Sequence, residues 1–201
     1  MKTRVAALSV ALAIASLICT VAYAQGSTWK SSDGTMSISA STIDIGSSKI
    51  VARGNAYVKS ADKLTNRIFE ACAGSITVTL FSAPGAKGGP AGLDLIKSAD
   101  FSGPVKLVYT LTEQGTPTKT IALADQATYN GTDKIAYLLG NVKITNENPS
   151  IFDAPAVMTG DKATINLKRM LGPDEFRFRV ESTSGVSRIE ATTKTKDDGK
   201  K

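Results

Sequence analysis

The chain has 201 residues, 42% of them hydrophobic, with two cysteines and no histidine. The lack of histidine excludes Ser-His-Asp and Cys-His catalytic arrangements and histidine-based zinc sites, and two cysteines exclude a four-cysteine zinc site. The formal net charge is +6, but residues 1–24 hold two of the cations and the tail from Lys194 holds four lysines against two aspartates, which leaves +2 and no charge-based argument for nucleic-acid binding.

Residues 1–24 have the organisation of a cleavable signal peptide. Lys2 and Arg4 precede an apolar run over 5–21, and Ala-Tyr-Ala at 22–24 gives the small-x-small pattern after which signal peptidase cuts. The alternative is a helix retained as a membrane anchor, because about 20 apolar residues can span a bilayer. The Ala-x-Ala ending and the polar sequence after it favour cleavage, so we expect an exported protein.

Residues 25–192 are expected to form one domain of short β-strands, because apolar and polar side chains alternate with a period of two. The alternating apolar sets are, in chain order, Ile76, Val78 and Leu80; Val105, Leu107, Tyr109 and Leu111; Ile121 and Leu123; Ile135, Tyr137 and Leu139; Val142 and Ile144; Ile165 and Leu167; and Phe176, Phe178 and Val180. Turn-forming sequences separate them, at 46–48, 130–133, 146–149 and 172–174. Regularly spaced short strands predict an all-β sandwich, barrel or jelly roll.

Two segments depart from the strand pattern. The Gly/Pro-rich sequence SAPGAKGGPAG over 82–92 predicts a loop that connects two parts of the sheet, and it lacks the spacing of a phosphate-binding P-loop. Residues 193–201 are charged and are expected to form a disordered tail.

An internal repeat relates 40–80 to 124–167. Each copy has a polar turn, Lys-Ile, an apolar run, Gly-Asn, a second apolar run and, later, Ile-Phe-acid-Ala. Such a repeat indicates a strand-turn-strand unit stacked on itself. The Gly-Asn pairs at 54–55 and 140–141 lie within strand patterns, where glycine is typical of a bulge or sharp bend; a two-residue hairpin turn is the alternative. Inward residues at odd positions before 140 and even positions after it favour the bulge, since one extra residue swaps the faces.

An exported carbohydrate-active enzyme is a weak alternative. A pair of carboxylates can hydrolyse glycosides, and Glu70, Asp153 and Asp161 are the candidates. Glu70 and Asp153 occupy equivalent places in the repeat beside turn-like sequence, where an acid more often caps a turn. We therefore expect no catalytic residues, no metal site and no cofactor.

The apolar face of the strands is the first candidate site. If the two sheets of a jelly roll stand slightly apart, their inward side chains form a trough in which each buried acyl methylene contributes about 0.8 kcal/mol. A fully packed core is the alternative. The candidate lining residues are Ile76, Val78, Leu107, Tyr109, Ile121, Leu123, Ile135, Tyr137, Leu139, Val142, Ile144, Ile165, Phe176 and Phe178.

Cations on strand rims are the second candidate, because they can form charge-assisted hydrogen bonds with lipid phosphates. The candidates are Lys59, Lys63, Arg67, Arg177 and Arg179. An ordinary solvated strand face is the alternative for each of them.

The second repeat copy resembles the OstA-like domain of the periplasmic lipopolysaccharide-transport family, especially its soluble LptA-like bridge. The similar residues are Ala-Thr-Tyr at 127–129, Leu-Leu-Gly-Asn-Val-Lys-Ile at 138–144 and Gly-Asp-Lys-Ala at 160–163; the first copy has a weaker version at 53–58. The resemblance implies a periplasmic, twisted antiparallel β-jelly roll with open ends. It also implies an apolar groove for lipopolysaccharide and end-to-end strand pairing with other such domains, including further copies of the chain. The loop at 82–92 is longer than the family's pattern.

Together these observations predict a non-enzymatic exported protein that binds lipopolysaccharide or a related amphipathic lipid and carries it towards the outer membrane. The alternative is an exported structural β-repeat protein with a packed core and no lipid cargo.

Overall fold

The computed structural model describes residues 26–62, 65–82, 92–183 and 185–194. The expected signal peptide at 1–24, Lys63, residues 83–91 of the Gly/Pro-rich loop and residues 195–201 of the tail lie outside this description. Within the described ranges, no helix has the length and apolar character needed to span a membrane.

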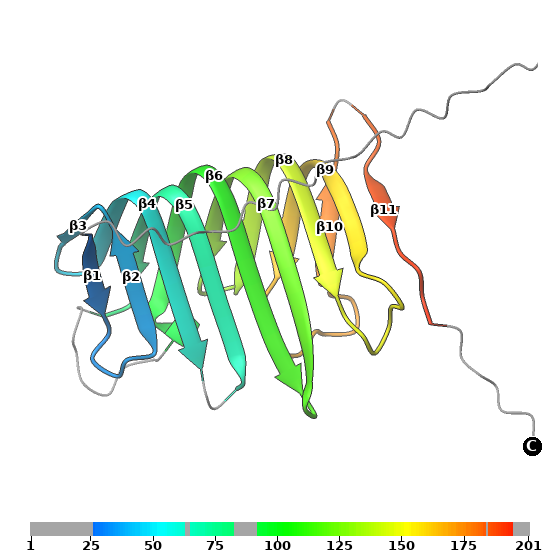
Figure 1. The fold of residues 1–201 in the computed structure, drawn as a ribbon, viewed down its shortest axis with the longest axis horizontal. Coiled ribbons are helices and arrows are strands. Elements are labelled where there is room, and N and C mark those ends of the chain that lie inside the picture. Colours follow the sequence, from blue (N-terminus) through cyan, green and yellow to red (C-terminus); the bar gives the residue numbers. More distant parts are fainter. Residues whose placement is uncertain (1–25, 63–64, 83–91, 184, 195–201) are drawn as a thin grey trace, which may run out of the picture.

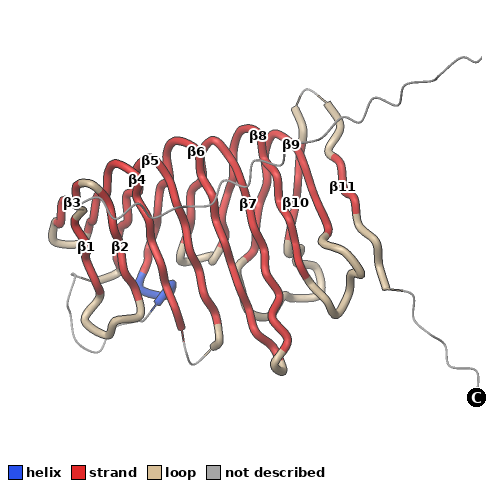
Figure 2. Tube along the Cα trace, viewed as in Figure 1, coloured by secondary structure: helices blue, strands red, loops and turns tan. Residues whose placement is uncertain are grey.

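A single antiparallel sheet of eleven strands forms the domain (Figures 1 and 2). The elements are β1 (Ser27–Lys30), β2 (Met36–Ala40), β3 (Thr42–Ile45), β4 (Lys49–Asp62), β5 (Arg67–Leu80), the short 3-10 helix η1 (Gly92–Leu95), β6 (Ile96–Glu113), β7 (Thr116–Asn130), β8 (Ile135–Glu147), β9 (Ala156–Asn166), β10 (Phe178–Glu181) and β11 (Arg188–Glu190). The sheet order is β1-β2-β4-β5-β6-β7-β8-β9-β10, with β3 beside β4 and β11 beside β9. The prediction of an all-β antiparallel jelly roll is confirmed.

The long strands bend midway, so that the sheet folds over along one line, which we call the crease. In Figure 1 the crease runs along the upper side, and it divides the sheet into a front half and a fainter rear half. The front half contains the β4–β5 and β6–β7 turns, whereas the rear half contains η1 and the β7–β8 turn. The side of the molecule opposite the crease is where the two halves end without being joined by strands, and we call it the open side.

Bulges in alternate strands produce the crease. β4, β6 and β8 each hold one residue more than their neighbours, within 53–56, 102–105 and 139–142. A bulge bends its strand and increases the local twist, so three aligned bulges fold the whole sheet. The expected bulge at Gly140-Asn141 is therefore confirmed, and the hairpin alternative is wrong.

Glycine is required at the crease for two reasons. Gly54, Gly103 and Gly140 have φ values of 78°, 89° and 79°, in the left-handed region that a side chain disfavours. Space is also short, because a Cβ at Gly140 would lie 2.3 Å from Asp125 Oδ2 on the neighbouring strand. Asn141, at φ 46°, follows in the same region and donates a hydrogen bond from Nδ2 to that carboxylate at 2.9 Å.

The inward face of β8 differs from our expectation. Tyr137 and Leu139 are 47% and 48% exposed, whereas Ala136 and Leu138 are buried. Ile135 shares the outer face with Tyr137, since its neighbour Ala136 faces inward. Even positions therefore point inward on both sides of the bulge, and the predicted swap of faces in β8 is wrong.

β7 requires the same correction. Leu123 is 37% exposed and Ile121 lies on the same outer face, whereas Ala122 and Ala124 are buried. The swap of faces occurs in β7 instead, because its inward residues pass from Ala124 to Ala127 and so change from even to odd positions. The additional residue in the β8 bulge keeps the two strands paired on both sides of this change.

Alanine at inward positions explains why the larger apolar residues were misleading. Both inward residues that flank the crease are alanines in β4 (Ala52 and Ala56) and in β7, whereas in β6 they are Phe101 and Val105. Small side chains on β4 and β7 and large ones on β6 therefore line the crease, and such a mixture of sizes lets side chains interdigitate. A rule that places the larger of two alternating apolar residues inside therefore chooses the wrong face of a strand whose inward residues are alanines.

The sequence repeat holds at the crease and fails beyond it. Gly-Asn pairs in β4 and β8 form equivalent bulges. The Ile-Phe-acid-Ala matches are not equivalent, because Phe69 is buried in β5 whereas Phe152 lies in the β8–β9 loop and bridges to Thr193. Glu70 and Asp153 therefore do not occupy corresponding places.

Replacing Gly140 by alanine tests the crease against a matched control. Gly115, in the β6–β7 turn, also has φ 79°, but a Cβ there meets no atom within 4 Å. We expect Gly115→Ala to lower the free energy of unfolding by about 1–2 kcal/mol through backbone strain alone. Gly140→Ala should cost about 1 kcal/mol more, because the Asp125 carboxylate must give up its hydrogen bond. Urea unfolding measures both, and equal losses would show that the contact at the crease is unimportant.

Candidate functional site

The apolar interior between the two halves is one contiguous cluster of buried side chains from Met36 in β2 to Leu167 after β9. Seven predicted lining residues point into it and are buried: Ile76, Val78, Leu107, Tyr109, Val142, Ile144 and Ile165. Phe178 on β10 packs against the edge of the cluster. Side chains fill the space between the two halves. The interior therefore has the apolar composition expected of an acyl-chain trough, but it is packed as a core is.

The remaining predicted lining residues do not belong to the interior. Ile121, Leu123, Ile135, Tyr137 and Leu139 lie on the outer face, as described above. Phe176 is 70% exposed, because it precedes β10 in a loop and has no strand to set its direction.

Sequence reasoning missed an aromatic group inside the domain. Phe69 on β5 makes an edge-on contact with Phe101 at 6.5 Å and a stacked contact with Tyr129 at 6.4 Å between ring centroids. These three residues come from different strands, so no local pattern brings them together. The sequence signal that could have placed each of them inside was the period-two alternation of apolar residues around it.

Each end of the folded sheet presents two strand edges, one on each half. At one end β1 borders the front half beside β2 and β3 borders the rear half beside β4. At the other end β11 pairs with residues 157–159 of the front half and β10 with residues 162–165 of the rear half. In the described part of the chain these four strands pair on one side only, so their outer edges remain available for pairing with another chain.

Two of the candidate catalytic carboxylates, Glu70 and Asp161, are held apart. Glu70 lies on β5 and Asp161 on β9, four strand spacings away, which is about 19 Å at about 4.8 Å per spacing. Glycoside hydrolysis needs carboxylates about 5–10 Å apart. Asp161 also accepts hydrogen bonds from the Thr183 amide and hydroxyl at 2.7 and 2.9 Å, as a loop-fixing residue does.

The predicted rim cations fall into different environments. Lys59 lies on the outer face and pairs with Glu70 at 3.2 Å. Burial opposes ionisation of Glu70, but the Tyr57 hydroxyl and the Lys59 ammonium outweigh it and hold the pKa of the carboxyl below its ordinary value. Arg179 is well exposed and lies 3.9 Å from Glu181. These two cations fit the solvated-face alternative.

Arg67 links the two halves across the open side. It begins β5 on the front half, is 6% exposed, and pairs with Asp62 at 3.0 Å and with Asp94 of η1, on the rear half, at 3.6 Å. Lys134, after the β7–β8 turn of the rear half, pairs with the same Asp94 at 2.5 Å. Burial disfavours the charged guanidinium, but its bond to Asp62 and the charge of Asp94 outweigh this and raise the pKa of Arg67. We call the group Arg67–Asp94–Lys134 the clasp.

Arg177 organises the loop between β9 and β10. Its Nη1 donates to the carbonyl oxygens of Asn166, at 2.6 Å, and of Lys168, and Nη2 donates to that of Arg169 at 3.3 Å. Satisfying three carbonyls with one guanidinium fixes the backbone of a segment without regular hydrogen bonding. Arg177 is thus a structural residue, and the neighbours that it positions face the open side.

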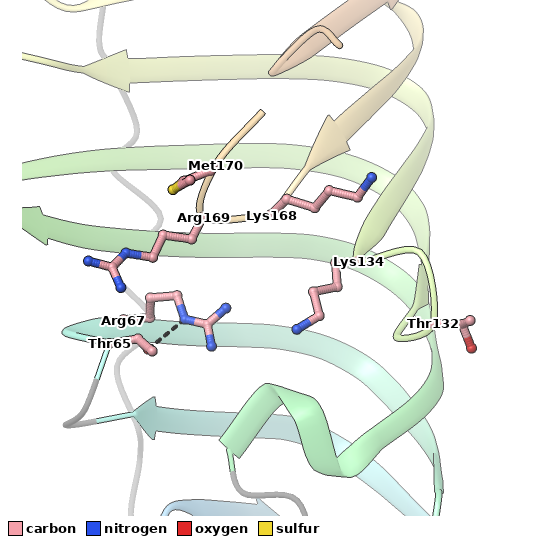
Figure 3. Close-up of a pocket in the computed structure, with 7 residues that line it drawn as sticks. All are labelled: Thr65, Arg67, Thr132, Lys134, Lys168, Arg169 and Met170. Atoms are coloured by element: carbon pink, nitrogen blue, oxygen red, sulfur yellow. Dashed lines mark hydrogen bonds between the residues drawn. The ribbon is translucent and has the colours of Figure 1, made fainter. Parts of the chain in front are cut away.

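A pocket of about 390 Å³ lies on the open side, next to the clasp (Figure 3). Its lining comes from three separate segments: Thr65 and Arg67 at the start of β5, Thr132 and Lys134 at the β7–β8 turn, and Lys168, Arg169 and Met170 in the β9–β10 loop. We call it the basic mouth, because four of its seven lining residues are cationic. The sequence predicted Arg67 as a rim cation but gave no sign that the other three would join it.

Neutralising Asp94 tests the clasp. Asp94→Asn keeps the side-chain size but removes the charge that spans the halves, so we expect the free energy of unfolding to fall by about 1 kcal/mol. The exposed Arg53–Asp44 pair is a matched control, with 57% and 67% of the side chains accessible. Asp44→Asn should cost at most about 0.5 kcal/mol. Urea unfolding of both variants, with 1 M salt added in a second series, would reveal whether the clasp contributes no more than a surface ion pair.

Neither a family model nor a curated protein sequence matches this chain. Its fold is similar to that of a solved structure described as LptH, the LptA-homologous periplasmic component of the lipopolysaccharide transport device from Pseudomonas aeruginosa. The two share 15% sequence identity with a TM-score of 0.52, over 80% of this chain and 95% of the other. The likeness extends over nearly the whole of LptH, and it shows that this chain has an LptA-like fold.

Proposed function

We propose that the chain is an exported periplasmic carrier for lipopolysaccharide or a related amphipathic lipid. The acyl chains lie between the front and rear halves of the folded sheet, and the polar headgroup remains outside on the open side. The carrier passes this lipid towards the outer membrane without chemical change.

The observation that carries this proposal is the geometry of the apolar interior. A contiguous apolar cluster runs along the folded sheet, and among the described residues no strand crosses its open side. Each acyl methylene moved from water into such an interior contributes about 0.8 kcal/mol, so a few chains bind tightly without any catalytic group. The similarity in fold to LptH supports the same function.

Lipid entry requires the two halves to separate. The interior side chains are in contact, so an acyl chain must displace them towards the open side while the crease acts as the hinge. The left-handed glycines of alternate strands allow this change at the crease with little steric cost. The clasp opposes it, because opening breaks the Arg67–Asp94 ion pair.

End-to-end association completes the proposed carrier. The edges of β1 and β3 at one end and of β10 and β11 at the other offer backbone hydrogen-bonding groups on both halves. A second copy, or another domain of the same fold, pairs with these edges head to tail, which places successive interiors in line. The predicted signal peptide at 1–24 delivers the protein to the periplasm.

The packed interior itself favours a second candidate function. Buried side chains from Met36 to Leu167 form one cluster, as in an ordinary core. An exported structural β-repeat protein needs nothing more than this cluster and the strand edges.

Photocrosslinking distinguishes the two candidates. Benzoylphenylalanine is placed at Phe178, which packs against the interior, and at Tyr137, which is 47% exposed on the outer face, so that both changes replace one aromatic ring by another. With purified lipopolysaccharide and ultraviolet light, the carrier proposal predicts lipid adducts at position 178 at least about tenfold above those at position 137.

The same experiment on a known lipopolysaccharide carrier calibrates the yield. If that carrier forms adducts and position 178 of this chain does not, the structural candidate is correct. Equal adducts at both positions would indicate surface adsorption and would also contradict the carrier proposal.

A further inference from the structure

The basic mouth has more positive charge than its ion pairs neutralise. Asp62 and Asp94 balance Arg67 and Lys134, and Glu175 balances Lys168 at 2.5 Å. Arg169 makes no ion pair within the described ranges, whereas Arg177 donates to carbonyl oxygens and also lies within the field of Glu113 and Glu175. The mouth therefore attracts an anion.

The charged ends of three of these cations follow one another across the pocket. In Figure 3 the guanidinium of Arg67 lies between the charged ends of Arg169 and Lys134, whereas Lys168 points away from them. Asp94 already pairs with both Arg67 and Lys134, so a further anion gains most from the unpaired charge of Arg169. A phosphate suits this arrangement, because its oxygens can accept charge-assisted hydrogen bonds from several cations at once.

The segment that presents Arg169 is held in place before any ligand binds. The Arg177 guanidinium fixes the carbonyls of Lys168 and Arg169, as described above, and the Gly172 amide donates to Glu175 Oε2 at 2.8 Å. The Leu167 amide donates to the Lys134 carbonyl at 2.8 Å, which joins this loop to the β7–β8 turn. The backbones of Arg169 and Lys134 are therefore positioned relative to each other, so less backbone entropy is lost on binding.

Apolar surface lies on both sides of these cations. Met170 in the same lining is 80% exposed, and Tyr109 and Tyr129 of the interior lie close enough to Arg67 for its charge to affect their pKa values. The mouth thus combines cations with the apolar interior behind them.

We propose that the basic mouth binds a phosphate monoester on the headgroup of the carried lipid, with Arg169 and Lys134 as direct ligands and Arg67 as the fixed charge beneath them. This inference rests on the proposed lipid-carrying function and specifies the headgroup chemistry that the carrier selects. The acyl chains continue from the phosphate into the interior.

Three soluble probes test the inference with the chain that starts at Gln25. Dodecyl phosphate carries the phosphate and an acyl-like chain, dodecyl maltoside carries the chain alone, and inorganic phosphate carries the anion alone. Isothermal titration calorimetry below the micelle concentrations gives each affinity. We expect dodecyl phosphate to bind at least about tenfold more tightly than either other probe, since charged hydrogen bonds add to apolar burial.

Substitutions on the turn and loop locate the effect. The double variant Lys134→Gln and Arg169→Gln should remove most of the preference for dodecyl phosphate and leave dodecyl maltoside unchanged. The matched control is Lys143→Gln with Arg188→Gln, which removes the same charge from exposed positions on β8 and β11. Arg67 is left intact, because it is buried and pairs with both Asp62 and Asp94. Lys134 also belongs to the clasp, so urea unfolding of the double variant separates a loss of stability from a loss of binding.

Each outcome is decisive. Equal affinity for the two dodecyl compounds overturns the phosphate site while leaving the carrier function intact. Equal affinity for dodecyl phosphate and inorganic phosphate identifies an anion site without a lipid headgroup and overturns the inference. If the double variant and its control lose the same affinity for dodecyl phosphate, net charge alone explains the binding, and the inference is overturned. If dodecyl maltoside does not bind while dodecyl phosphate binds through Lys134 and Arg169, the phosphate site is supported and the apolar trough of the carrier proposal is contradicted.

Discussion

The close approach of two halves of one sheet is the constraint on which the rest of this structure depends. A sheet that folds over on itself must bend every long strand at the same level, and bulges with left-handed glycines at 54, 103 and 140 provide that bend. The same approach leaves little space inside, which explains the alanines on β4 and β7 that flank the crease. The volume of the interior, the strand register and the position of the open side all follow from the crease.

Much of the fold could be predicted because it depends on local patterns. Period-two alternation indicated the strands, and the Gly-Asn pair at 140–141 marked a bulge. The direction of Tyr137 and Leu139 could not be predicted by the same rule, because Ala136 and Leu138 on the other face are also apolar, and the pattern of apolar residues does not say which face is buried. Knowing that alanines lie beside the bend in β7 would have corrected the face of that strand, and its pairing with β8 would then have corrected the face of β8.

The candidate site was predictable only where it coincides with the core. Ile76, Leu107 and Ile144 belong to the interior as their strands suggested. The basic mouth joins segments near residues 65, 134 and 169, and their proximity is a property of the folded sheet that no sequence spacing records. Arg177 illustrates the same limit, since a cation placed on a rim by its sequence in fact supports a loop through three carbonyls.

The alternation of bulged and unbulged strands also restricts how this fold can change in length. β4, β6 and β8 carry the additional residue, and β5, β7 and β9 change face opposite to it. Inserting a single strand would place two bulged or two unbulged strands side by side, and this would interrupt the crease. A whole hairpin is therefore the smallest unit by which evolution or a designer can lengthen the molecule, and the Gly-Asn bulges repeated in β4 and β8 are what growth by duplicated hairpins would leave.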